Sequence, residues 1–516
     1  MNIGSIFWLS SYKHGPLTAI VDGQMRFTYG ELLKRVKCLA RGMVAKGMGK
    51  GKKVAMMLPN CHQFVEVYFA TLATGAVAVP VNFRFLPHEI RFILEDCEPD
   101  ALFFHSSYRE RVESAIEGLP FRLWTVTVEG KVPFAEDYEE ILRSSQGLQE
   151  PLEMMEEDPC QIMYTSGTTG TPKGAVIPHR AVLWNLVNTI HGREDREGER
   201  ALVIGPMYHT AALNNHLTIQ IALGGTCILV RSFEPELVLK LIEGEKATTI
   251  SGAPTMYHML MEHPKACHYD LSSITKCTSG ASTLPQDTLR RLQNFFPRIQ
   301  GVYDVYGCTE ASPTISILRE HESRYKPGSV GRPVPFVEVR IVDHEDRPLP
   351  LGEVGELVCR GPNVMLGYHN NPQATEEALR NGWLHTGDLA RVDEEGFIYV
   401  VDRKKDLIIS GGENIYPREI EEVLLEHPAI GDAAVVGSPD PIWGEIVHAF
   451  VVVRKGWSLN ENEVIEHCKA RLASYKKPRR VTFLDQIPRN PSGKILKTKL
   501  RELVSTRNEN WVRGNS

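Results

Sequence analysis

Short apolar segments alternate with amphipathic segments along about the first 300 residues of the chain. Residues 54–58, 75–80 and 101–104 have the length and composition of buried strands. Apolar side chains also recur at helical spacing after a capping box at residues 28–31. Strands and helices that alternate in this way form βαβ units, in which helices cover both faces of a largely parallel sheet. We therefore predict an α/β fold, with further strands at 201–204, 226–230 and 248–251 and further helices at 211–222, 235–245 and 286–296.

The pattern changes twice in the second half of the chain. From about residue 328, short alternating segments separated by Gly, Pro and Asp indicate a more antiparallel, β-rich region. After residue 402 a new α/β pattern runs for about 110 residues, which is enough for a small separate domain. A chain of 516 residues is also too long for one compact core. We expect a large N-terminal domain over residues 1–402 and a small α+β domain over residues 403–516.

Composition disfavours several classes of protein. The formal net charge of −6 provides no bulk attraction to nucleic acid. The ten cysteines include no Cys-x-x-Cys pair, so we expect reduced thiols rather than a zinc site or a disulfide scaffold. The first residues lack the pattern of a signal peptide, and no apolar segment reaches transmembrane length. We expect a cytoplasmic enzyme that does not bind nucleic acid, whereas peripheral membrane contact and a homodimer remain open.

Residues 164–174 form the stretch Tyr-Thr-Ser-Gly-Thr-Thr-Gly-Thr-Pro-Lys-Gly, which contains one lysine and no acidic residue. Such a stretch can wrap a polyanion, because glycine lets backbone N–H groups approach closely and hydroxyl groups add donors. A flexible linker is disfavoured, because the stretch runs directly into the apolar segment 175–177. A P-loop is excluded, because Lys173 is followed by Gly174 rather than by Ser or Thr.

This stretch resembles the phosphate-binding signature of the adenylate-forming superfamily, which comprises acyl-CoA synthetases, carrier-protein adenylation domains and firefly-type luciferases. Further motifs follow in that family's order and cover nearly the whole chain. The resemblance implies that ATP is bound in this stretch by Thr165, Ser166, Gly167, Thr168, Thr169, Gly170 and Lys173.

Two later motifs resemble the family's adenine and α-phosphate contacts. One is a turn of small residues, Thr-Ser-Gly-Ala-Ser at 278–282, on which a flat adenine base can lie. The other is Tyr-Asp-Val-Tyr-Gly-Cys-Thr-Glu at 303–310. In the second motif, the resemblance implies that Tyr306 stacks on adenine, that Thr309 is a catalytic donor to the α-phosphate and that Glu310 binds Mg²⁺. Thr165 is the second implied metal ligand. The other nucleotide contacts that these motifs imply are Gly280, Ala281, Ser282, Asp304 and Gly307.

The next motifs resemble the family's ribose, hinge and thiol contacts. In Gly-Trp-Leu-His-Thr-Gly-Asp at 382–388, Asp388 would accept both ribose hydroxyls, a task that suits a carboxylate. Arg403 would be the second ribose contact, and Lys405 would be the pivot about which the C-terminal domain rotates. The implied CoA contacts are Gly411 and Gly412 beside the pantetheine arm, Trp443 along it, and Tyr475 and Lys477 near the CoA nucleotide.

Residues 490–496, Asn-Pro-Ser-Gly-Lys-Ile-Leu, resemble the family's C-terminal lysine loop. The resemblance implies that Lys494 is catalytic, because it would bridge the acyl carboxylate and the α-phosphate. It also implies that the C-terminal domain is mobile and removes Lys494 before the thioester forms. The implied cofactors are ATP, CoA and Mg²⁺, and the implied partner is a small carboxylic acid.

The resemblance implies that His209 is a catalytic residue beside the acyl pocket, which it would gate. Residues 211–213 are Ala, Ala and Leu, where amino-acid-activating domains usually carry an Asp, so a substrate ammonium would lack its counter-charge. Tyr303 and Val305 stand where many family members have glycine, and these larger side chains should shorten or bend the cavity.

We therefore predict an AMP-forming acyl-CoA synthetase. Its predicted substrate is a medium- to long-chain fatty acid. The alternatives are a benzoate-like aryl acid, acyl loading of a carrier protein and, less favoured, a luciferase-like oxygenase. A non-catalytic regulator is disfavoured because Glu310, Asp388 and Lys494 are all present.

Overall fold

The computed structural model describes residues 2–165, 172–280, 286–489 and 495–504. The chain forms two compact units. The larger unit comprises residues 1–339, 358–386 and 395–398, and the smaller unit comprises residues 340–357, 387–394 and 399–516. The predicted domain boundary after residue 402 stays a prediction.

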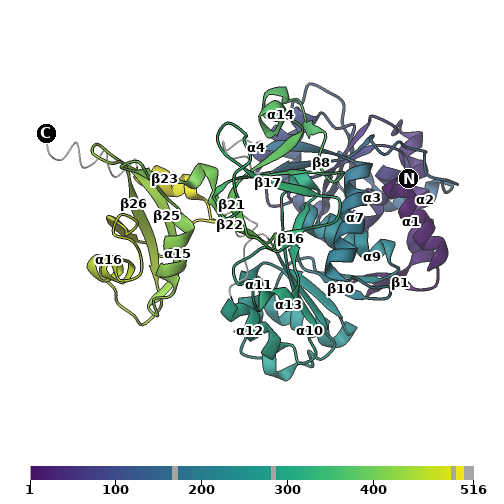
Figure 1. The fold of residues 1–516 in the computed structure, drawn as a ribbon. Coiled ribbons are helices and arrows are strands. Elements are labelled where there is room, and N and C mark those ends of the chain that lie inside the picture. Colours follow the sequence, from purple (N-terminus) through teal and green to yellow (C-terminus); the bar gives the residue numbers. More distant parts are fainter. Residues whose placement is uncertain (1, 166–171, 281–285, 490–494, 505–516) are drawn as a thin grey trace. The chain divides into compact units, whose positions relative to one another are not determined.

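The larger unit contains a nine-stranded sheet (Figure 1). Its strands pair in the order β16-β15-β14-β13-β12-β10-β11-β1-β2, and every neighbouring pair from β14 to β1 is parallel. Strand β1 thereby pairs with β11, which follows it in the chain by about 200 residues. The bounds are β1 Thr18–Asp22, β2 Met25–Thr28, β10 Arg200–Val203, β11 Thr226–Leu229, β12 Thr249–Gly252, β13 Lys276–Gly280, β14 Gly301–Gly307, β15 Thr314–Leu318 and β16 Arg332–Pro333.

A second, eight-stranded sheet has the order β19-β9-β8-β4-β3-β5-β6-β7. Neighbours from β8 to β7 are parallel, whereas β8, β9 and β19 pair in antiparallel fashion. The bounds are β3 Lys53–Met57, β4 Val77–Pro80, β5 Ala101–His105, β6 Trp124–Val128, β7 Glu136–Asp137, β8 Pro159–Thr165, β9 Lys173–Pro178 and β19 Gly367–Tyr368.

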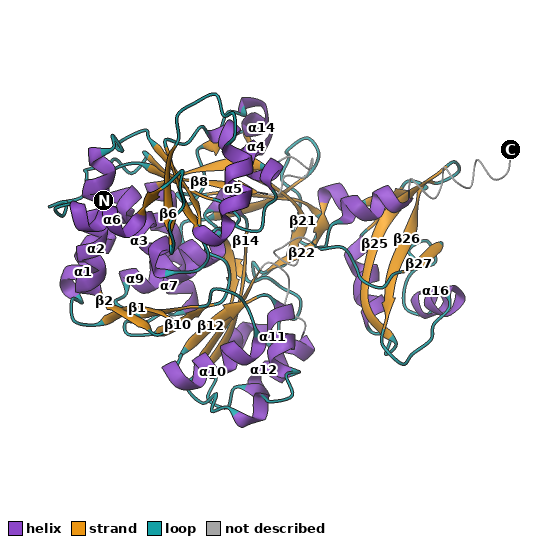
Figure 2. Ribbon diagram, turned by 180° about the vertical axis from the view of Figure 1, so that it is seen from behind, coloured by secondary structure: helices purple, strands orange, loops and turns teal. Residues whose placement is uncertain are grey.

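Helices cover both faces of each sheet (Figure 2). Helix α3 (His62–Ala73) is buried on all sides, because it shares one apolar core with strands of both sheets. Helices α10, α11 and α12 pack in the core on the other face of the nine-stranded sheet, and α4 and α5 do so on the eight-stranded sheet. The remaining bounds are α1 Ile3–Lys13, α2 Tyr29–Ala45, α4 Pro87–Cys97, α5 Arg109–Ile116, α6 Tyr138–Ser144, α7 His179–Arg193, α10 Pro235–Glu245, α11 Pro254–Met261, α12 Gln286–Phe295, α13 Glu320–Ser323 and α14 Pro372–Ala378.

These layers confirm the predicted α/β fold. The predicted capping box is also present, since the Thr28 side chain accepts from the Glu31 N–H and the Glu31 carboxylate accepts from the Thr28 N–H. The helix predicted at 211–222 differs in one respect. It consists of a short helix α8 (Thr210–Ala212), a π-turn η2 (Leu213–Leu217) and a short helix α9 (Thr218–Ala222).

A further five-stranded sheet follows in the β-rich region, in the order β17-β18-β21-β20 with β22 paired to β21. Its bounds are β17 Glu338–Val342, β18 Gly355–Arg360, β20 Leu379–Arg380, β21 Trp383–Val392 and β22 Ile398–Arg403.

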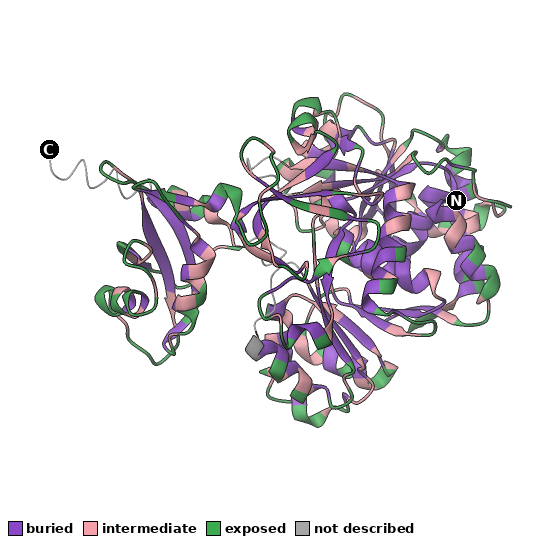
Figure 3. Ribbon diagram, in the orientation of Figure 1, coloured by how far each residue is buried: buried purple, intermediate pink, exposed green. Residues whose placement is uncertain are grey.

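The C-terminal part of the chain forms its own five-stranded sheet, β24-β23-β26-β25 with β27 paired to β26. Helices α15 and α16 share an apolar core with it, and the long strands β25 and β26 are mostly buried (Figure 3). The bounds are β23 Ile408–Ser410, β24 Glu413–Ile415, α15 Pro417–Leu425, β25 Ile430–Asp440, β26 Gly444–Val453, α16 Glu461–Lys469 and β27 Arg480–Phe483.

Within the part of the chain that the structure describes, no helix combines the length and the apolar character needed to cross a bilayer.

Candidate functional site

The Gly-rich stretch connects two paired strands. Strand β8 ends at Thr165, strand β9 begins at Lys173, and these two residues are opposite each other in the antiparallel ladder. The Thr165 hydroxyl donates to the Lys173 carbonyl at 3.4 Å. Gly174 has no room for a side chain, because an added Cβ would lie 2.8 Å from a methyl group of Ile162. The predicted phosphate contacts Ser166, Gly167, Thr168, Thr169 and Gly170 lie outside the described residues.

Strand β19 brings Tyr368 to this end of β9, where Tyr368 pairs with Ala175. The Tyr368 hydroxyl donates to Oε1 of Glu310 at 2.7 Å. The Lys173 ammonium lies 5.4 Å from the centroid of the same ring. Burial, and then the Glu310 carboxylate, raise the pKa of the Tyr368 phenol, so the hydroxyl stays protonated and keeps donating. One tyrosine thus groups the lysine of the Gly-rich stretch with the glutamate of a motif about 140 residues away.

Tyr368 is not among the site residues that the sequence analysis predicts. The residues around it, Leu-Gly-Tyr-His at 366–369, belong to none of the motifs that the sequence analysis identifies. The signal is the antiparallel pairing of β19 with β9, which exists only in the folded chain.

Glu310 and Thr309 lie in the single turn η4 (Thr309–Ala311), directly after strand β14. The backbone packs tightly here, because an added Cβ at Gly307 would lie 1.7 Å from the Pro313 carbonyl oxygen, which accepts from the Cys308 N–H. Glycine at 307 is therefore required by the close approach of two backbone segments. The Met365 N–H donates to the Glu310 carbonyl at 2.9 Å and further restrains the turn.

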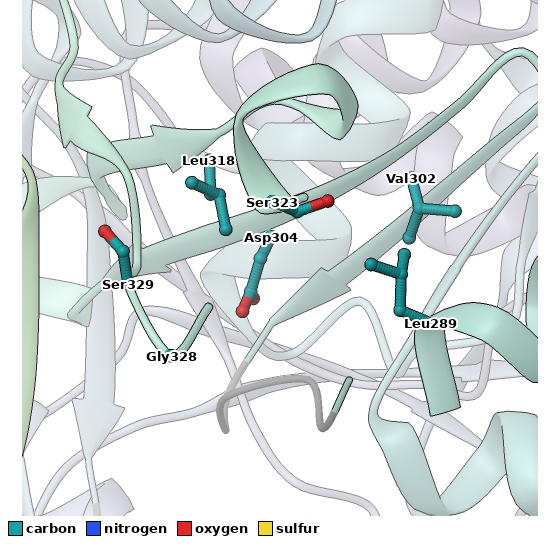
Figure 4. A pocket seen from close by; sticks show the side chains of 7 residues that line it. All are labelled: Leu289, Val302, Asp304, Leu318, Ser323, Gly328 and Ser329. Carbon is teal, nitrogen blue, oxygen red and sulfur yellow. The ribbon is translucent and has the colours of Figure 1, made fainter. Parts of the chain in front are cut away.

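Strand β14 places its side chains on two sides. Asp304 is buried and lines a small pocket with Leu289, Val302, Leu318, Ser323, Gly328 and Ser329 (Figure 4). A carboxylate beside apolar side chains can accept a hydrogen bond from an amino group of a flat heterocycle. Gly280, at the end of β13, pairs with Val305, so the predicted adenine turn begins beside this part of β14. Tyr306 is half-buried, and the predicted contacts Ala281 and Ser282 lie outside the described residues.

Tyr303 and Val305 belong to a different apolar core from Val302. Tyr303 is only 7% exposed, and burial, followed by the nearby Glu194, raises the pKa of its phenol to about 12. The space beside Val305 is therefore occupied by a large, uncharged ring along the same strand.

His209 precedes α8 and is half-buried, with its ring 4.5 Å from that of Tyr208. The helical segment that follows, residues 210–222, is buried except at Ala211, His216 and Ala222. Burial, and then Arg193, lower the pKa of His216 to about 3, so its imidazole is neutral at physiological pH. Residues 209–222, which the resemblance implies form the acyl-pocket wall, thus include small apolar side chains and an uncharged imidazole.

The described residues contain no cluster of three or more His, Cys, Asp or Glu side chains that could hold a metal ion. Mg²⁺ commonly takes only one or two carboxylates from the protein and the rest of its ligands from phosphates and water. Glu310 fits that pattern, because Tyr368 uses Oε1 and leaves Oε2 without a hydrogen-bond donor among the described residues.

In the smaller unit, Asp388 on β21 and Arg403 at the end of β22 form an ion pair, with Nε and Oδ1 3.3 Å apart. Lys405 lies in the turn that follows, where burial lowers the pKa of its ammonium. Its carbonyl accepts from Arg501 at 3.4 Å, and Arg501 also binds Asp406 at 2.7 Å. The two predicted ribose contacts, Asp388 and Arg403, are therefore adjacent. The predicted pivot, Lys405, is hydrogen-bonded through its carbonyl to Arg501 near the C-terminus.

Gly411 and Gly412 form the two-residue turn between β23 and β24, with φ of +60° and +88°. An added Cβ at Gly411 would lie 2.7 Å from the Trp443 ring, whereas Gly412 faces open space. Trp443 is 40% exposed, and the Arg479 guanidinium lies 4.4 Å from its centroid. Arg479 was not among the predicted CoA contacts, although it lies in a basic segment of the sequence.

Two other predicted CoA contacts lie on the same unit, one exposed and one half-buried. Tyr475 is 42% exposed, and Lys477 donates to the Ser474 carbonyl at 3.4 Å. Lys494 lies outside the described residues. The roles given to all these residues stay predictions.

Known proteins resemble this chain over almost its whole length. The family model of the AMP-binding enzyme matches residues 7–369, and that of the AMP-binding enzyme C-terminal domain matches residues 419–494. The feruloyl-CoA synthase of Amycolatopsis sp is 41% identical over 487 residues, which are 94% of this chain and 95% of that protein. The long-chain-fatty-acid–CoA ligase of Bacillus subtilis (strain 168) is 37% identical and covers 96% of this chain and 94% of its own. The crystal structure of the anthranilate CoA ligase AuaEII in complex with anthranoyl-AMP superposes with a TM-score of 0.90, at 26% identity, over 98% of this chain and 97% of its own.

Proposed function

The chain belongs to the AMP-binding enzyme family of AMP-forming acid–thiol ligases, and from this premise we propose that it converts a compact aryl carboxylic acid to its CoA thioester. In the first half-reaction a carboxylate oxygen bonds to the α-phosphorus of ATP and pyrophosphate leaves. In the second, the CoA thiol loses its proton, its sulfur bonds to the acyl carbon and AMP leaves.

The observation that carries the proposal is the grouping of Lys173, Tyr368 and Glu310. The two reactants of the first half-reaction are both anions, so the site must offset their repulsion. Lys173 supplies a positive charge at the end of the phosphate-binding stretch. Glu310, with Thr165, would hold Mg²⁺, which offsets phosphate charge when bound. Lys494 would supply the second cation at the reacting oxygens.

The preference for a compact acid rests on Tyr303 and Val305. A buried tyrosine and a branched side chain occupy the strand along which a long alkyl chain would need space. The neutral His216 and the small Ala211 leave a wall that suits a flat ring better than a charged group. The similarity to a feruloyl-CoA synthase supports the same class.

A fatty acid is the second candidate. The similarity to a long-chain-fatty-acid–CoA ligase favours it, and so do the apolar residues 211–213. Each methylene that a pocket accommodates adds about 0.8 kcal/mol of transfer free energy. A series of fatty acids of increasing length therefore separates the two classes. If Tyr303 closes the cavity, kcat/KM should stop rising at a short chain length.

We propose CoA rather than a carrier protein as the acceptor. The exposed Arg479 guanidinium beside the Trp443 ring offers a cation for the several phosphates of CoA, whereas a carrier's phosphopantetheine arm has only one phosphate. All ten cysteines are free thiols, which supports a reducing, cytoplasmic compartment.

The test is a pyrophosphate-release screen with ATP, Mg²⁺ and a panel of acids, with and without CoA. The panel comprises ferulic, indoleacetic, anthranilic and benzoic acids and saturated fatty acids from C6 to C18. We expect the highest kcat/KM for an aryl acid and a CoA-dependent thioester product. Highest activity on C16 or C18 acids would replace the aryl proposal with the fatty-acid one. Release without thioester, accompanied by oxygen-dependent light, would indicate a luciferase-like enzyme instead.

A further inference from the structure

Four buried asparagines hold the segment that follows the turn η4. They are Asn185 on α7, Asn214 and Asn215 in the π-turn η2, and Asn363, and each is at most 4% exposed. Buried amides need hydrogen-bond partners, because an unsatisfied amide in the interior is costly. Their partners here are concentrated on residues 311–314.

Two of these asparagines, Asn185 and Asn215, form a closed ring of hydrogen bonds with Thr314. The Thr314 N–H donates to Oδ1 of Asn185 at 3.0 Å. Nδ2 of Asn185 donates to Oδ1 of Asn215 at 2.8 Å. Nδ2 of Asn215 in turn donates to the Thr314 hydroxyl at 3.0 Å. Each member holds the other two, so none can move alone without breaking a buried bond.

Two more amides bind the backbone beside this ring. Nδ2 of Asn363 donates to the carbonyls of Ala311 and Thr314, both at 2.9 Å. Nδ2 of Asn214 donates to the Ser312 carbonyl at 3.4 Å, while Oδ1 of Asn214 accepts from Gln161 at 2.8 Å. The backbone from 311 to 314 is therefore fixed on several sides.

The two ends of this network belong to different parts of the site. Thr314 is four residues after Glu310, which itself lies in the turn η4. Asn214 and Asn215 belong to the π-turn that directly follows α8, so they continue the wall that begins at His209. π-turns within helices occur frequently at functional sites.

We propose that Asn215 and Thr314 are positioning residues that couple the acyl-pocket wall to the nucleotide-binding turn. This inference rests on the proposed function, because that function assigns the acid to the wall and ATP to the turn. The ring holds the π-turn and the residues after η4 at one fixed spacing. Loosening it displaces both binding surfaces together, although Asn215 and Thr314 are themselves buried.

The central variant is Thr314→Val, which preserves the volume and branching of the side chain but removes the hydroxyl. It leaves Nδ2 of Asn215 without its acceptor in a fully buried position. We expect KM for ATP and KM for the best acid of the panel each to rise about tenfold, which corresponds to about 1.4 kcal/mol. Thr314→Ser retains the hydroxyl, and we expect it to restore both constants to within about twofold of the wild type.

Asn188→Ala is the matched control. Asn188 lies on α7 one turn from Asn185 and is fully buried, and neither of its amide atoms has a hydrogen-bond partner among the described residues. Its removal should lower Tm by creating a cavity and leave both KM values unchanged. It thereby separates a general loss of stability from a loss of positioning.

The affinity for AMP, measured by titration calorimetry on the full chain, provides a readout without turnover. We expect Thr314→Val to weaken AMP binding and Asn188→Ala to leave it unchanged. Unchanged AMP affinity in Thr314→Val, or a rise in only one of the two KM values, would overturn the coupling. A wild-type enzyme that releases no pyrophosphate with any acid would overturn the proposed function instead.

Discussion

The Tyr368 hydroxyl donates a 2.7 Å hydrogen bond to the Glu310 carboxylate, joining strand β19 to the turn after strand β14. The bond orients a carboxylate that has one oxygen left for a metal ion. It also places the aromatic ring beside Lys173. An orienting partner of this kind determines how well a carboxylate holds a cation.

Tyr368→Phe should weaken the binding of magnesium-ATP while preserving the fold. The ring and its packing remain, but Glu310 loses the donor that orients it. We expect the Mg²⁺ concentration for half-maximal pyrophosphate release to rise about tenfold, because a hydrogen bond to a charged group contributes about 1.5–3 kcal/mol. Tyr29→Phe is the control, since it removes another phenol hydroxyl, which is fully buried and donates to the Gly225 carbonyl. Equal Mg²⁺ dependence in the two variants would show that Tyr368 has no part in metal binding.

Val305→Gly should extend the range of acids toward longer chains. Replacing the branched side chain opens space beside Tyr303, so the point at which kcat/KM stops rising in a C6–C18 series should move to longer acids. Each accommodated methylene contributes about 0.8 kcal/mol. Val302→Ala, which changes a neighbouring residue in a different core, should leave the profile as in the wild type. A profile that does not move in Val305→Gly would mean that the chain never reaches this strand.

Gly411→Ala should impair thioester formation more than adenylate formation. The new methyl group would lie 2.7 Å from the Trp443 ring and displace it, and φ of +60° is unfavourable for alanine. We expect pyrophosphate release near the wild-type rate and a loss of at least about tenfold in transfer of a supplied acyl-adenylate to CoA. Gly412→Ala has a similar backbone strain but meets nothing within 4 Å, so it tests whether strain alone is responsible. Equal losses of CoA transfer in Gly411→Ala and Gly412→Ala would contradict the assignment of Trp443 to the CoA site.

Lys494→Ala should abolish adenylate formation and spare the second half-reaction. The lysine is predicted to stabilise charge at the reacting carboxylate and phosphate only while the adenylate forms. Pyrophosphate release should fall by about two to three orders of magnitude, whereas conversion of a supplied acyl-adenylate to thioester should continue. Lys499→Ala removes a nearby exposed lysine and should affect neither step. A parallel loss of both steps would contradict the assignment of Lys494 to the first.

Acid should destabilise the fold through His179. Burial lowers the pKa of this histidine to about 4, and its Nδ1 accepts a 3.3 Å hydrogen bond from the Ile3 N–H. Below pH about 6.5 the unfolded chain takes up a proton that the folded chain excludes. The free energy of unfolding should therefore fall as pH drops from about 6.5 to 4, by up to about 1.4 kcal/mol per unit. Urea denaturation at pH 7.5, 6.0 and 5.0 measures the slope. The slope of unfolding free energy against pH should be shallower in His179→Asn than in the wild type. His88→Asn changes an exposed site and should retain the wild-type slope. Equal slopes in the two variants would exclude His179 as the cause.

Much of the fold was predictable because its signals are local. The helix at 235–245 and the capping box at Thr28 appear where the sequence predicts them, since helical spacing and capping depend on residues only a few positions apart. The π-turn at 213–217 was not predictable, because the pattern of apolar residues there is that of an ordinary helix. Its side chains Asn214 and Asn215 find their partners on α7, β8 and β15, which local sequence does not specify.

Residue patterns along the chain are sufficient to predict the α/β class, the family resemblance and the order of the motifs. Those properties follow from the periodicity of apolar residues and from short motifs, which can be recognised without knowledge of the fold. Tertiary structure alone decided which side chains meet: Tyr368 with Glu310, Trp443 with Gly411, and Thr314 with Asn185 and Asn215. Such pairs are brought together by strand pairing and by packing between distant segments. A hydrogen bond or a van der Waals contact extends only a few ångströms, so it depends on spatial distance and not on separation along the chain.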